Sequence, residues 1–206
     1  MIGSRYKVFF DRKLTGLAKA VIKTGVTPNQ LTLIGLILSF LACIFLIFTK
    51  QVLIFCVSMT LIGCLDALDG LVARLTGRAS KFGAYLDAMC DRYFEAATVI
   101  AVAYVTGYWF LSFLVITGAM LTSYAKARAG MEVAVSNTEW PDFMERLERS
   151  ALFMAGLFLS QIFNGKFFGH DLFFWTLVLI AAGTHLTAVQ RMLRAKTIIE
   201  GRADFK

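Results

Sequence analysis

The sequence of 206 residues has few of the features that mark a soluble, secreted or disordered protein. It holds only two prolines and four cysteines, and the cysteines lack the paired spacing of zinc or redox motifs. Charged residues make up 17% of the chain, against about 25% in a typical soluble domain. The basic N-terminus also lacks the short apolar core and cleavage site of a signal peptide. Disordered, fibrous and disulfide-rich classes are therefore excluded, and we expect the N-terminal segment to remain in the mature protein.

Long apolar runs are what the sequence has instead, since 58% of its residues are apolar. The stretch from Leu31 to Thr49 contains no charged residue, and about 20 such residues cross a bilayer as a helix. The sequence predicts an all-α integral membrane protein, with residues 1–206 as one membrane domain. A juxtamembrane amphipathic helix is expected within 1–26. Six spans are expected at about 31–49, 52–75, 83–105, 108–128, 150–164 and 172–195.

The positive charge of the chain indicates its orientation. The net charge is +7, and almost all Lys and Arg outside the spans fall before the first span or after even-numbered spans. The opposite loops hold only Lys50 and Lys166. By the positive-inside rule, both termini face the cytoplasm of a multi-pass cell-membrane protein. The bilayer thus accounts for the basic charge, and we expect no nucleic-acid partner.

Four aspartates lie at the cytoplasmic edge of the second and third predicted spans. Asp66 and Asp69 are three residues apart, and Asp87 and Asp91 are four apart, so each pair shares a helix face. The short connection between the spans makes them antiparallel neighbours and can bring the pairs together. Ionisable groups at this depth are usually functional, and clustered carboxylates favour Mg²⁺, Mn²⁺ or Ca²⁺. Alternatively, the aspartates pair with nearby basic residues, namely Arg74, Arg78, Lys81 and Arg92.

These residues resemble the signature of the CDP-alcohol phosphotransferase family, D-x2-D-G-x2-A-R-x8-G-x3-D-x3-D. All eight of its fixed positions are present. They are Asp66, Asp69, Gly70, Ala73, Arg74, Gly83, Asp87 and Asp91. The resemblance implies transfer of a lipid phosphate from a CDP-lipid, CDP-diacylglycerol or CDP-archaeol, to an alcohol with release of CMP. It also implies a homodimer.

The same resemblance assigns roles to the motif residues. The first three aspartates would hold two ions, Mg²⁺ or Mn²⁺, on the pyrophosphate, and Asp91 would complete the metal site and act as the base. Positions lining the nucleotide pocket would be Gly70, Ala73, Arg74 and Gly83, although small residues here also suit close helix packing. Asn29 and Thr32 lie in a stretch that resembles a family element near the nucleotide, with an ordinary helix start as the alternative.

Two further stretches resemble the branch that makes phosphatidylinositol phosphate and its archaeal counterpart. The first is Ser123–Ala129 followed by Met144–Arg149, and the second is Val189–Arg191. That branch uses inositol 1-phosphate as acceptor, and its phosphate would be bound by Lys126, Arg149 and Arg191. Leu147 departs from the branch, which usually has proline there. Glycerol 3-phosphate, the acceptor for phosphatidylglycerol phosphate synthesis, is the alternative within the family. A divalent-cation transporter is the alternative outside it, although the second half of the chain does not repeat the aspartate motif.

Overall fold

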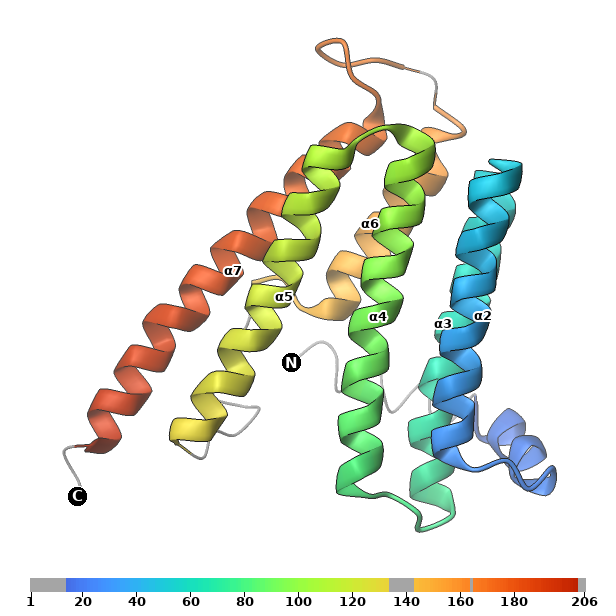
Figure 1. Ribbon diagram of the computed structural model, residues 1–206, viewed down its shortest axis with the longest axis vertical. Helices are drawn as coiled ribbons and strands as arrows, with labels where there is room; N and C mark the ends of the chain where they lie inside the picture. The colour runs from blue at the N-terminus through green and yellow to red at the C-terminus, as the bar shows by residue number, and fades with distance from the viewer. Residues whose placement is uncertain (1–13, 134–142, 164, 204–206) are drawn as a thin grey trace. The chain divides into compact units, whose positions relative to one another are not determined.

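The structure is a computed structural model that describes residues 14–133, 143–163 and 165–203, and its regular elements there are α-helices (Figure 1). A helix at 14–23 comes first. The next six are α2 (Pro28–Thr49), α3 (Val52–Leu75), α4 (Lys81–Thr106), α5 (Trp109–Glu132), α6 (Arg146–Ser160) and α7 (Leu172–Ala203). The chain divides after Val105 into two compact units.

In the first unit, α2 begins at a capping box. The Gln30 backbone N–H donates to Thr27 Oγ1 at 3.3 Å, and the Thr27 N–H donates to Gln30 Oε1 at 2.9 Å. Pro28 follows the cap, where its missing N–H costs nothing. At the other end Lys50 adopts a left-handed conformation with φ of 56°, so that α2 stops and α3 begins two residues later.

The helix at 14–23 is packed onto α2 and α3 through a small apolar cluster. Ala18 is fully buried there against Leu31 of α2 and against Leu68, Leu71 and Val72 of α3. The described part of the predicted amphipathic helix therefore buries an apolar face against the protein. Residues 1–13 of that prediction lie outside the described residues.

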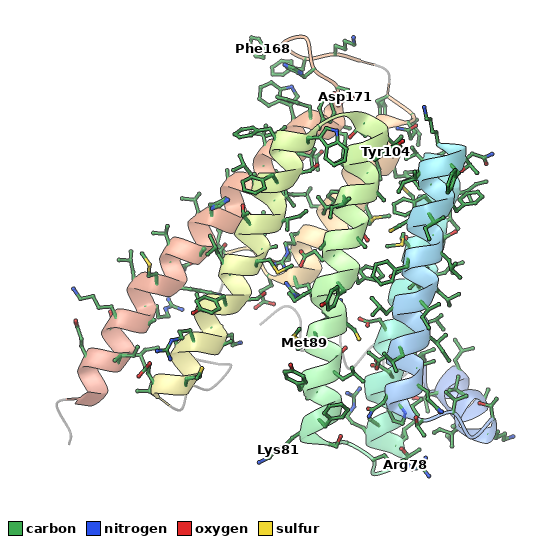
Figure 2. The ribbon with its side chains drawn as sticks, in the orientation of Figure 1. Arg78, Lys81, Met89, Tyr104, Phe168 and Asp171 are labelled. Carbon is green, nitrogen blue, oxygen red and sulfur yellow. The ribbon has the colours of Figure 1, made fainter. Side chains whose placement is uncertain are left out.

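The connection between α3 and α4 is short, as the sequence predicts. Gly77 turns the chain with φ of 66°, and Ser80 Oγ accepts a hydrogen bond from the Gly83 N–H at 2.9 Å. Arg78 and Lys81 lie at this end of the unit, and Tyr104 lies toward the opposite end of α4 (Figure 2). The turn places the start of α4 beside the end of α3, where the predicted aspartates are concentrated.

In the second unit, α7 packs against both α5 and α6. Glycines allow the close approach. A Cβ on Gly118 of α5 would lie 2.9 Å from Thr184 Cβ, and one on Gly156 of α6 would lie 2.7 Å from Thr176 Cβ. Both threonines belong to α7, whose buried face is thus in contact with backbone on two sides.

The residues before α5 and α7 are linked by a hydrogen bond. Tyr108 donates its hydroxyl to Asp171 Oδ2 at 2.9 Å, while Asp171 Oδ1 caps α7 by accepting from the Phe174 N–H at 2.8 Å. Burial, with help from Asp171, raises the pKa of Tyr108 to about 12. The phenol therefore stays protonated at neutral pH and keeps donating. Figure 2 shows Asp171 next to the loop that carries Phe168.

Four helices are long and apolar enough to cross a membrane, namely α2, α3, α5 and α7. The chain is therefore a helical membrane protein with at least that number of candidate spans among the described residues. The predicted ranges 31–49, 83–105 and 108–128 differ from α2, α4 and α5 by up to four residues at an end, and the last two ranges differ most. The fifth was predicted at 150–164, but α6 begins at Arg146 and ends at Ser160, because Glu145 and Glu148 form a capping box; residue 164 lies outside the described residues. The sixth was predicted to end near 195, whereas α7 continues to Ala203.

Candidate active site

Three of the four predicted aspartates come together where α3 meets α4. One carboxylate oxygen from each of Asp66, Asp69 and Asp87 lies within 4.8 Å of the others. Asp69 is buried, with 6% of its surface exposed, and the other two are half-buried. The three-residue spacing in α3 puts Asp66 and Asp69 on one helix face, and the short turn brings α4 back to that face.

The donor set fits a hard divalent cation. Like charges this close disfavour one another's ionised form unless a cation neutralises them. Carboxylate oxygens suit Mg²⁺, Mn²⁺ and Ca²⁺, and the cluster contains no cysteine or histidine that would favour zinc. Arg92 is one of the basic residues that could instead pair with the aspartates, and it forms an ion pair with Glu95 at 2.8 Å.

Asp91 lies one helical turn beyond Asp87 on α4 and does not belong to the cluster of three. It is buried, with 8% of its surface exposed. A buried carboxylate therefore lies next to the cluster of three.

Thr32 of α2 contacts the same cluster. Its hydroxyl donates a hydrogen bond to Asp69 Oδ2, across 37 positions of sequence, and also lies 3.1 Å from the carbonyl oxygen of Pro28. The side chain therefore joins the first turn of α2 to the aspartate-bearing end of α3.

A cavity of about 220 Å³ opens beside the cluster, between the start of α2, the end of α3 and the start of α4. All six residues that the sequence suggested for the CDP-lipid line it, together with two of the aspartates. They are Asn29, Thr32, Gly70, Ala73, Arg74, Gly83, Asp69 and Asp87. Residues from three separate helices thus converge on one hollow within the first unit.

Gly83 of this cavity has a steric reason. A Cβ on Gly83 would lie 3.0 Å from Asn29 Oδ1 and 3.1 Å from Ser80 Oγ, closer than normal van der Waals contact. A Cβ on Gly70 would lie 3.4 Å from Arg74 Nη1, an ordinary contact with the end of a flexible side chain. The absence of a side chain at Gly83 therefore keeps its part of the cavity open.

Sequence reasoning missed several lining residues, of which Arg78 and Ser80 carry polar groups. Arg78 was grouped with the charges that orient the chain. Ser80 had a recognisable signal, since a serine three residues before Gly83 matches a helix cap. Both lie in the eight-residue gap of the motif, which its fixed positions do not describe.

The basic residues predicted to bind the acceptor lie in the second unit, one on each of its three helices. Lys126 of α5 is half-buried. Arg149, in the first turn of α6, is 3% exposed, and Arg191 of α7 is 8% exposed. Topology alone would leave such residues in the headgroup region, and a buried guanidinium is costly without partners. The two arginines are thus buried more deeply than the orientation of the chain requires.

Two hydrogen bonds bring the helix segments carrying these residues together. The Arg191 guanidinium donates to the Thr122 carbonyl oxygen, one turn before Lys126 in α5. The Met144 N–H, just before α6, donates at 3.2 Å to Thr187 Oγ1, one turn before Arg191 in α7. The exposed Arg128, in contrast, forms an ion pair with Glu132 at 2.6 Å.

Comparison with known proteins shows the family to which the chain is similar. The model of the family described as CDP-alcohol phosphatidyltransferase matches residues 25–189. The chain is 34% identical over 199 residues to the archaetidylinositol phosphate synthase of Pyrococcus horikoshii, covering 96% of this chain and 98% of the relative. It is 35% identical over 187 residues to the phosphatidylinositol phosphate synthase of Corynebacterium glutamicum, covering 87% and 82%.

A solved structure has the same fold. It is the phosphatidylinositol phosphate synthase PgsA1 of Mycobacterium tuberculosis with CDP-DAG bound, which matches with a TM-score of 0.79 at 25% identity. The match covers 90% of this chain and 94% of that one.

Proposed function

The chain belongs to the CDP-alcohol phosphatidyltransferase family, and from that premise we propose that it transfers the phosphatidyl or archaetidyl group of a CDP-lipid to inositol 1-phosphate. The acceptor hydroxyl attacks the phosphorus bonded to the lipid, the bond from that phosphorus to the CMP oxygen breaks, and CMP leaves. The observation that carries the proposal is the cavity in the first unit, where motif residues of α3 and α4, together with Asn29 and Thr32 of α2, surround two of the clustered aspartates.

The donor end of the reaction is assigned to this cavity. Asp66, Asp69 and Asp87 would hold Mg²⁺ or Mn²⁺, two ions in all, with Asp91 as a further ligand. Bound there, the ions would neutralise the pyrophosphate and stabilise the charge on the departing CMP. Around them Gly70, Ala73 and Gly83 leave room for the nucleotide and Arg74 supplies a positive charge, with Asn29 and Thr32 at the edge of α2.

Asp91 is assigned as the general base. It would accept the proton of the acceptor hydroxyl as the new bond to phosphorus forms. Two features support this role: its place one turn beyond Asp87, and its burial, at 8% exposed.

The acceptor end is assigned to the second unit. Lys126, Arg149 and Arg191 would bind the phosphate of inositol 1-phosphate, which needs a basic site of this kind. The names of the two relatives compared above support the acceptor. Neither glycerol 3-phosphate as acceptor nor cation transport is favoured by these relationships.

The family match covers most of both units, and we treat residues 1–206 as one functional domain. We further propose that α4 and α6 also cross the membrane, which gives six spans. The cell membrane would hold the protein with both termini and the active site on the cytoplasmic side, as the distribution of basic residues indicates. We also propose that the protein forms a homodimer, as the family resemblance implies.

The experiment that tests the donor chemistry follows CMP release from CDP-diacylglycerol or CDP-archaeol by the purified protein in detergent. CMP should appear only when inositol 1-phosphate and Mg²⁺ or Mn²⁺ are both present, and Asp91→Asn should abolish its release. Full activity of Asp91→Asn would remove the base assignment.

Arg191→Gln tests the acceptor site. Loss of a charge-assisted hydrogen bond costs about 1.5–3 kcal/mol, so we expect the KM for inositol 1-phosphate to rise about 10- to 150-fold. The KM for the CDP-lipid should change little. The matched control is Arg128→Gln, which removes an exposed arginine paired with Glu132 and should leave both constants unchanged. An effect confined to the CDP-lipid KM would place Arg191 at the other substrate.

A further inference from the structure

The hydroxyl of Thr32 is directed at the cluster of carboxylates. In the first unit, buried Thr98 uses its hydroxyl in the usual way for a helix, donating to the Phe94 carbonyl oxygen one turn back at 2.7 Å. Thr32 has the corresponding backbone acceptor at 3.1 Å, in Pro28, but also has Asp69 Oδ2 within hydrogen-bonding distance. A hydroxyl carries one proton, and the ionised carboxylate is the stronger acceptor.

The surrounding structure fixes this contact from both sides. Thr32 and Asp69 are both buried, at 7% and 6% exposed. Their chain neighbours Leu31 and Leu68 belong to the apolar cluster that packs helix 14–23 against α2 and α3. The capping box at Thr27 sets the start of α2 one turn before Thr32. The contact is therefore made at a packed junction of α2 and α3.

We propose that Thr32 is a positioning residue for the metal site. Its hydroxyl holds the Asp69 carboxylate in an orientation that lets Asp69 bind the same cation as Asp66 and Asp87. The inference rests on the proposed function, because it takes these three aspartates as the cation ligands. It assigns to Thr32 a task different from binding the CDP-lipid directly. Hydrogen bonds from outside the ligand set orient ligands in this way, and losing one typically lowers metal affinity about 10- to 100-fold.

The test measures Mn²⁺ binding to the full chain in detergent, with no CDP-lipid or acceptor present, from the electron paramagnetic resonance signal of free Mn²⁺. Thr32→Val keeps the shape of the side chain and removes the hydroxyl, so its Kd for Mn²⁺ should rise about 10- to 100-fold. Thr32→Ser restores the hydroxyl and should bind within about threefold of the unaltered protein. Thr98→Val, the matched control, should bind as the unaltered protein does.

A second measurement separates positioning from direct contact with the donor. At saturating Mn²⁺, Thr32→Val should keep nearly the original KM for the CDP-lipid, while the Mn²⁺ concentration for half-maximal activity rises. If Thr32→Val proves unstable, Thr32→Ala is measured in the same way, with thermal unfolding in EDTA as the check on folding.

The outcomes are distinct. Unchanged Mn²⁺ affinity in folded Thr32→Val or Thr32→Ala overturns the positioning role and leaves the proposed function standing. A raised CDP-lipid KM at saturating Mn²⁺, with unchanged Mn²⁺ affinity, returns Thr32 to the donor site. If the unaltered protein binds no Mn²⁺, the metal assignment of the proposed function fails as well.

Discussion

Replacing Gly83 by alanine tests whether the cavity beside the aspartates holds the CDP-lipid. The added methyl would lie 3.0 Å from Asn29 Oδ1 and 3.1 Å from Ser80 Oγ. It would also take roughly the volume of one water molecule, about 30 Å³, from a cavity of about 220 Å³. Overpacking of this kind costs about 1–3 kcal/mol.

The cost should fall mainly on substrate binding. Asn29 lines the cavity, so a shift of its side chain into that space would relieve the contact in the empty enzyme, but the nucleotide would then have to displace it. We expect the lower half of that range, about 1–2 kcal/mol, which corresponds to a rise of about 5- to 30-fold in the KM for the CDP-lipid. The KM for inositol 1-phosphate should not change.

The assay is CMP release at varied CDP-lipid concentration, with thermal unfolding measured in parallel. Gly63→Ala is the matched control, since a Cβ on Gly63 meets nothing within 4 Å and alanine stabilises a helix by about 0.5–1 kcal/mol relative to glycine. Ser80→Ala isolates the contribution of the helix cap. An unchanged CDP-lipid KM in folded Gly83→Ala would refute the placement of the nucleotide in this cavity.

Two further predictions concern the second unit. Gly118→Ala should destabilise the second unit by about 1–3 kcal/mol, because the new Cβ would overlap Thr184 of α7. Gly130→Ala, in the same helix with nothing within 4 Å of its Cβ, should be neutral or stabilising in the same thermal unfolding assay. Equal effects of the two substitutions on thermal unfolding would contradict the packing described. Because folding raises the pKa of Tyr108 to about 12 from about 10, the unfolded chain loses this proton first as pH rises. Tyr108 should therefore contribute its full stabilisation below a pH of about 10, and the free energy of unfolding should fall between pH values of about 10 and 12. Tyr108→Phe should abolish that decline, whereas an identical alkaline decline in Tyr108→Phe would show that another group causes it.

Much of the fold could be predicted because apolar runs and their interruptions are local. The predicted range 52–75 coincides with α3, and the short connection expected after it is found between Leu75 and Lys81. The start of α6 was missed because Glu145 and Glu148 form a capping box before the apolar run. Hydropathy detects the apolar part of α6 but not the polar first turn that the cap adds.

Helix periodicity predicted the part of the candidate site that depends on which residues share a helix face. Spacing along α3 and α4 was sufficient to bring Asp66, Asp69 and Asp87 together, because one turn of helix fixes which side chains share a face. The hydroxyl of Thr32 could not be assigned to Asp69 in that way, since 37 residues separate them and the contact depends on how α2 packs on α3. Arg78 was missed as a lining residue for a related reason, because its place in the cavity depends on the path of the turn between α3 and α4.

The central claim is the transfer of a lipid phosphate to a phosphorylated polyol, and a comparison of acceptors tests it most directly. The purified protein would be incubated with CDP-diacylglycerol or CDP-archaeol, Mg²⁺, and one of inositol 1-phosphate, glycerol 3-phosphate, inositol or serine, and the lipid product would be identified by mass spectrometry. The proposal predicts a lipid carrying inositol phosphate, formed far faster than any other product. Strong turnover with unphosphorylated inositol, or with serine, would contradict it.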